Sequence, residues 1–250
     1  MSQLWKNSMR QFSFAIVMVL SVGTAAPALA ASMVNVDQSV TIDANDPFSF
    51  TTKFNGFTDG FAPVPGLSGL TKISYVMSTS SNKKYLFSFS VTNTSSAPLT
   101  SSRISIFGFD VDPNVKVSTS SATGTYSTVG AGNVPIIGDH EICFKAGGAS
   151  SNCAGGGSGG AAIGQTVNGT FTLSFDNSVP NRIFKLSNFF VRYQDVRNER
   201  RNGPSSAVGQ TVSITESVPE PASWLAMIAG FGVMGIALRR RGNSVARLAA

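Results

Sequence analysis

Residues 85–92 read YLFSFSVT, and this stretch decides the fold class. Apolar side chains fill every second position, so Tyr85, Phe87, Phe89 and Val91 share one face of an extended chain. Strict alternation is typical of an antiparallel strand with one buried face and one solvated face. The same period of two recurs at residues 48–54, 73–77, 171–176, 189–194 and 212–214. We therefore predict an all-β fold, a single antiparallel β-sandwich of about 8–10 strands.

One run departs from this alternation. Residues 103–109, RISIFGF, change face between Ile106 and Phe107. An extra residue in one strand of a pair produces such a change. The pattern predicts a β-bulge near Gly108.

The net charge of +6 comes from the two ends of the chain. Of the 19 Lys and Arg residues, six lie in the terminal segments, which leaves 13 against 13 acidic residues within residues 31–220. A neutral body without a basic stripe argues against nucleic acid as a partner.

The first 30 residues have the pattern of a secretory signal peptide. Lys6 and Arg10 precede an apolar run at residues 12–22, and Ala28 and Ala30 mark the preferred cleavage site. Cleavage after Ala28 is the alternative. We expect the general secretion machinery to export a body spanning residues 31–217.

A second apolar segment lies at residues 218–242, VPEPASWLAMIAGFGVMGIALRRRG. Residues 221–238 carry no charge, and as a helix they extend about 27 Å, enough to cross an inner membrane. The following arginines predict a cytoplasmic stop under the positive-inside rule, with residues 243–250 as a cytoplasmic tail. These basic residues are Arg239, Arg240 and Arg241.

The same segment resembles a known sorting signal. The segment contains Pro219, Glu220, Pro221 and Trp224, followed by an apolar Gly-rich helix and then an Arg cluster. This order of parts resembles the PEP-CTERM signal, in its PEPxxWA subtype. The resemblance implies an exosortase as processing partner, transient residence in the inner membrane, and removal of the tail near the motif. It further implies delivery to the cell surface or extracellular matrix of a Gram-negative bacterium that makes exopolysaccharide.

The body also resembles one group of PEP-CTERM proteins. Stretches at residues 55–69, 103–114, 141–144, 153–160 and 188–194 are similar to the cistern family. That resemblance implies architecture and export, and it implies no enzymatic activity.

The two cysteines lie ten residues apart, at Cys143 and Cys153. In an exported chain such a pair predicts a disulfide. A redox or metal site is the alternative, but the C-x-x-C spacing that it favours is absent.

Residues for chemistry are sparse. The one histidine, His140, lies between Asp139 and Glu141, without a G-x-S-x-G motif elsewhere, and it indicates a polar loop leading into a strand. Residues 110–114 begin like a calcium loop but lack its later ligands, so a turn is the simpler interpretation. No spacing selects a glycosidase pair from the candidate carboxylates, which are Asp110, Asp112, Asp139, Glu141 and Asp195. We expect no cofactor, no metal and no enzyme activity.

The last candidate is a basic segment at residues 192–203. Tyr193, Arg197, Arg200 and Arg201 form a possible glycan contact, with the tyrosine as a stacking platform for an anionic polysaccharide. A solvated hairpin tip with internal ion pairs is the alternative.

The sequence thus predicts a non-enzymatic surface or matrix protein associated with exopolysaccharide or biofilm. The alternatives are a secreted glycan-binding or glycan-hydrolysing protein, or a permanently membrane-anchored protein that faces the periplasm.

Overall fold

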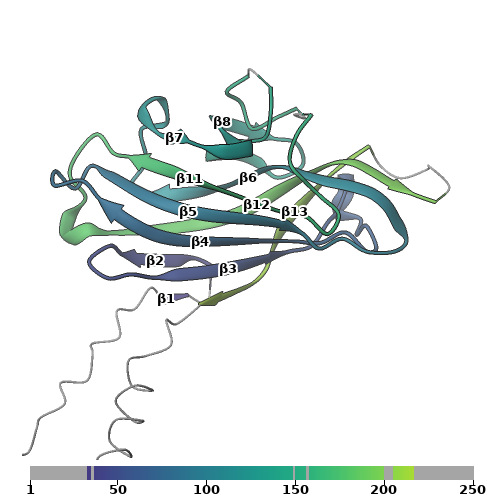
Figure 1. Cartoon of the computed structure of the whole chain (residues 1–250), viewed down its shortest axis with the longest axis horizontal. Helices are drawn as coiled ribbons and strands as arrows, with labels where there is room; N and C mark the ends of the chain where they lie inside the picture. Colours follow the sequence, from purple (N-terminus) through teal and green to yellow (C-terminus); the bar gives the residue numbers. More distant parts are fainter. Residues whose placement is uncertain (1–32, 35–36, 149, 156–157, 200–204, 217–250) are drawn as a thin grey trace, which may run out of the picture.

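The computed structural model describes residues 33–34, 37–148, 150–155, 158–199 and 205–216 (Figure 1). The predicted signal peptide and the predicted membrane-spanning segment lie outside these residues. Within the described part of the chain, no helix is long and apolar enough to cross a membrane.

The described residues form strands and short 3₁₀ turns, and no α-helix occurs among them. The expected all-β class is confirmed. The strands are β1 (Met33–Val34), β2 (Val40–Asp43), β3 (Ser49–Phe54), β4 (Gly69–Ser78), β5 (Lys84–Asn93), β6 (Leu99–Asp112), β7 (Ser121–Ala122), β8 (Thr128–Val134), β9 (Gly138–Lys145), β10 (Ala161–Ala162), β11 (Thr166–Ser174), β12 (Ile183–Asn198) and β13 (Ser206–Glu216). The turns are η1 (Asp59–Phe61), η2 (Val117–Thr119), η3 (Gly124–Tyr126) and η4 (Pro180–Arg182).

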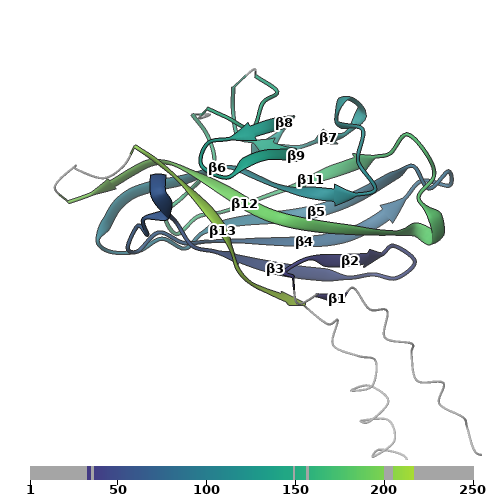
Figure 2. The same ribbon diagram turned by 180° about the vertical axis from the view of Figure 1, so that it is seen from behind.

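The strands form one continuous antiparallel path rather than two separate sheets. Its order is β7-β11-β5-β4-β3-β13-β12-β6-β9-β8. The first part of β13, through Gln210, pairs with β12, and the part from Thr211 onward pairs with β3. β13 therefore joins two halves of the sheet, one containing β3, β4, β5 and β11 and the other containing β12, β6, β9 and β8. Figure 2 shows β13 running obliquely from one half to the other. Because the terminal strands β7 and β8 also contact each other, the sheet is nearly closed around its core.

The predicted apolar face of residues 85–92 lies in that core. Tyr85, Phe87 and Val91 are fully buried, and Phe89 is nearly so. Phe87 pairs in register with Phe171 of β11, and their rings stack with centroids 5.0 Å apart. Burial of these rings is the main favourable contribution to folding.

The expected β-bulge in β6 exists, but it lies before Gly108. Arg192 of β12 pairs with Ile106, whereas the next residue, Tyr193, pairs with Ile104, so Ser105 is the extra residue. Ile104 therefore joins the main core, while Ile106 joins a smaller apolar cluster on the other side of the sheet. The sequence pattern misplaced the bulge because β6 is buried on both faces over this stretch.

Candidate functional site

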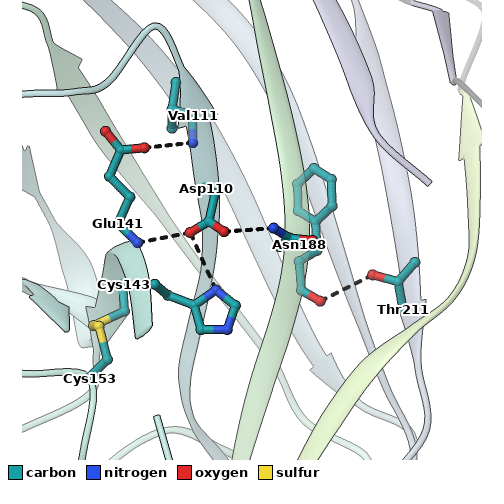
Figure 3. A network of polar contacts seen from close by, with 9 residues as sticks. Asp110, Val111, Glu141, Cys143, Cys153, Asn188 and Thr211 are labelled. Carbon is teal, nitrogen blue, oxygen red and sulfur yellow. Dashed lines mark hydrogen bonds and ion pairs between the residues drawn. A yellow bond between two sulfur atoms is a disulfide. The ribbon is translucent and has the colours of Figure 1, made fainter. Parts of the chain in front are cut away.

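A polar network joins β6, β9 and β12 where these strands lie side by side (Figure 3). Asp110 of β6 is at its centre. Its Oδ1 accepts a hydrogen bond from the backbone N–H of Glu141 at 2.8 Å, and its Oδ2 accepts one from Nδ2 of Asn188 at 2.8 Å. Nδ1 of His140 lies 3.3 Å from Oδ1, which is an ion-pair distance if the ring is protonated. One carboxylate therefore contacts both neighbouring strands.

A second bulge brings Asn188 into this network. Ser187 pairs with Asp110, but the next paired residue of β12 is Phe190, opposite Gly108. Asn188 adopts a positive φ of 50°, a conformation that asparagine tolerates better than most residues. Sequence reasoning did not identify Asn188, and its only signal was a turn-forming residue immediately before an apolar strand.

The pKa values of two carboxyl groups in the network are shifted in opposite directions. Burial disfavours the charged form of Asp110, but His140, the Glu141 N–H and Asn188 outweigh it and hold the pKa of Asp110 below its usual value. Burial raises the pKa of Glu141. Its carboxylate accepts hydrogen bonds from the backbone N–H groups of Val111, at 2.8 Å, and of Val115, and these bonds oppose the effect of burial only in part. Glu141 thus holds the backbone between residues 111 and 115 in place.

His140 is enclosed rather than part of an exposed polar loop. Its side chain is only 7% exposed, and its ring packs on Phe190 with centroids 4.3 Å apart. Its Nε2 is buried and has no hydrogen-bond partner among the described residues. A hydroxyl group that could act as a nucleophile with His140 is therefore not found within hydrogen-bond distance of Nε2 among the described residues.

Residues 110–114, which begin like a calcium-binding loop, have a structural role in the fold. Asp110 faces β9 and β12, as described above, and Asp112 ends β6. Among the described residues, no group of three or more His, Cys, Asp or Glu side chains is placed to hold a metal ion.

We expect Asp110→Asn to weaken the acid sensitivity of the fold. A carboxyl group with a depressed folded-state pKa contributes stability above its unfolded pKa of about 3.9 and loses it as pH falls through the folded value. Asparagine keeps an acceptor but has no charge, so the variant should lose about 1 kcal/mol at neutral pH and decline less below pH 4. Urea unfolding across pH tests this, with the exposed Asp59→Asn as the matched control. Parallel pH profiles of variant and wild type would contradict it.

The predicted disulfide between Cys143 and Cys153 is confirmed. Cys143 lies on β9 two residues from Glu141, and both cysteines are fully buried in the smaller apolar cluster with Ile106 and Phe190. The disulfide therefore joins the glycine-rich segment after β9 to the side of the sheet that carries the polar network (Figure 3).

Replacing both cysteines by serine should lower the free energy of unfolding by about 2.5–3 kcal/mol, because the unfolded chain regains the entropy of a ten-residue loop. Urea unfolding of the oxidised wild type and the double variant measures the difference. The reduced wild type is the control and should resemble the variant. Equal stability of the oxidised wild type and the variant would show that the crosslink constrains little.

The predicted glycan contact is wrong for Tyr193. Its ring is fully buried in the main core and its hydroxyl donates to the carbonyl of Asn55 at 3.2 Å. The alternating pattern of β12 places this residue on the core side, together with Phe189 and Val191. The exposed Arg197 donates through Nε to Asp195 at 2.7 Å, as expected for a hairpin with internal ion pairs. Arg200 and Arg201 lie outside the described residues.

Comparison with known protein families identifies a sorting motif at the C-terminal end of the chain. A family model described as the PEP-CTERM protein-sorting motif matches residues 217–241. The chain carries a PEP-CTERM motif. The matched segment contains Pro219, Glu220, Pro221 and Trp224, together with the three arginines at residues 239–241. A PEP-CTERM motif implies an exported protein that an exosortase processes in a Gram-negative bacterium. No curated protein and no solved structure matches the chain.

Proposed function

We propose that this chain is a non-enzymatic protein of the cell surface or extracellular matrix, delivered there by exosortase processing at its PEP-CTERM motif. The match to residues 217–241 carries the proposal, because that motif is a sorting address for exported proteins. The body supports a structural role. Two half-buried carboxyl groups, those of Asp110 and Glu141, accept hydrogen bonds from the backbone of neighbouring segments.

The proposal extends to the subtype and the setting. Trp224 follows the PEP triplet at the spacing of the PEPxxWA subtype, and several body segments resemble the cistern family. Both resemblances favour a bacterium that makes exopolysaccharide, so we propose that the protein is associated with that matrix or with a biofilm. The buried disulfide and the nearly closed sheet suit an exported domain.

The proposal is tested in the native bacterium by fractionating cells into inner membrane, outer surface and medium. We expect the protein outside the inner membrane in wild-type cells and retained in the inner membrane of a strain that lacks its exosortase. A permanently anchored, periplasm-facing protein is the second candidate. It predicts inner-membrane residence in both strains, and that result would overturn the proposal.

A further inference from the structure

The outward side chains of β3, β4, β5 and β11 form an open polar surface on one half of the sheet (Figure 1). On the other half, the side away from the main core carries the smaller apolar cluster around the disulfide. The alternation that buries Phe87 and Phe89 turns the polar residues of the open surface toward solvent, and all of them are exposed or half-buried. We call this surface the Lys72 face. It is formed by the side chains of Thr51, Lys53, Lys72, Ser88, Ser90 and Asn168.

Strand register places these polar residues in a row across the sheet. Lys72 pairs with Thr51 on one side and with Ser90 on the other. Ser90 pairs in turn with Asn168. Neighbouring strands lie about 4.8 Å apart, so the row extends about 14 Å. A shallow depression of about 350 Å³ follows it, lined by Lys72, Ser90 and Asn168 among others, so an extended polymer can contact several of these side chains at once.

The Lys72 face is basic. Its four strands, all of which the structure describes, contain no Asp or Glu. Lys53 pairs with Leu70, so it is a diagonal neighbour of Lys72, about 7–8 Å away. No carboxylate among the described residues forms an ion pair with either lysine. Two neighbouring positive charges without a counter-charge in the fold favour an anionic partner.

The uncharged groups of the face suit a partner rich in hydroxyls. Serine and threonine hydroxyls and the amide of Asn168 both donate and accept hydrogen bonds, as sugar hydroxyls do. Each contact on an exposed surface is weak, but such contacts add up along a polymer. We propose that the Lys72 face binds an acidic polysaccharide. Its carboxylates pair with the two lysines, and its hydroxyls exchange hydrogen bonds with Ser90 and Asn168.

This inference rests on the proposed association with exopolysaccharide, and it adds the binding face and the charge of the polysaccharide. The full chain, purified in a nonionic detergent, is immobilised and tested by biolayer interferometry at about 0.15 M salt. The probes are polygalacturonate, dextran and double-stranded DNA. We expect saturable binding of polygalacturonate, no binding of dextran at the same concentration, and weaker binding of DNA, which is anionic but offers few hydroxyls.

A matched pair of double variants locates the charge contacts. Lys53→Gln combined with Lys72→Gln should weaken polygalacturonate binding about three- to thirtyfold, the value of two exposed ion pairs. Lys83→Gln combined with Lys116→Gln removes the same charge beside Asp176, outside the face, and should change the affinity less than about twofold.

A single variant tests the hydroxyl contacts separately from charge. Asn168→Ala removes an exposed amide from the face and should weaken polygalacturonate binding about two- to tenfold, the value of one neutral hydrogen bond. Asn177→Ala removes the same exposed side chain from the loop after β11 and should leave the affinity unchanged.

Several outcomes would overturn the proposal. They are no saturable binding of polygalacturonate, equal binding of dextran or of DNA, equal effects of the two double variants, or unchanged affinity of Asn168→Ala. Binding by the purified protein does not require exosortase processing, so its failure would leave the proposed sorting untouched. Failed sorting with intact binding would overturn only the proposed route of delivery.

Discussion

We expect Phe171→Ala to lower the free energy of unfolding by about 3–5 kcal/mol, the range for truncating a fully buried phenylalanine. Phe171 lies on β11 in one half of the sheet, and its ring contacts aromatic rings of the other half. Its centroid lies 4.6 Å from Phe144 of β9 and 5.7 Å from Phe109 of β6. Alanine would leave a cavity where the two halves meet, and neighbouring rings can fill it only in part.

Phe61→Ala is the matched control for this experiment. Phe61 is 60% exposed and stacks on Phe57 at the surface, so the same truncation removes less buried surface and should lower the free energy of unfolding by less than about 2 kcal/mol. Urea unfolding of both variants and wild type measures the difference. If Phe171→Ala cost no more than Phe61→Ala, the two halves would not share one core.

Replacing Pro219, Glu220 and Pro221 together by alanine should abolish sorting. The PEP triplet is the recognisable core of the matched motif, whereas the apolar stretch and the arginines that follow it remain intact. A protein that still enters the membrane but is no longer recognised should accumulate there at full mature length. Immunoblots of membrane, surface and medium fractions measure this redistribution.

Asn243→Ala is the control, because it lies outside the matched segment and should sort like wild type. If the triple variant reached the surface as efficiently as wild type, the PEP triplet would not be the recognised element.

The fold class was predictable because alternation records which face of a strand is buried. Phe87, Phe89 and Phe171 follow that rule and lie in the core. The rule failed on β6, where Ile106 is buried on the opposite side against Phe190 and the disulfide, so both faces read as apolar. The continuous path through β13 was also unpredictable, because the change of partner at Gln210 leaves no mark in the side-chain pattern.

The candidate site was only partly predictable. The spacing of the two cysteines predicted the Cys143–Cys153 disulfide, because the length of the loop and the export of the chain can both be inferred from the sequence. It gave neither the contact between His140 and Asp110 nor the role of Asn188, because these residues are brought together by strand register. Tyr193 is close to basic residues in the sequence, but its position on the buried face of β12 places it in the core.

The intact mass of the protein from each cell fraction shows whether the protein is exported and processed at its PEP-CTERM motif. We predict a form outside the inner membrane that begins near Ala31 and ends near Pro219 to Pro221, with any excess mass giving the group attached there. A form that still ends at Ala250 and occurs only in the inner membrane would show that the C-terminal segment is a permanent anchor and that the protein is not sorted.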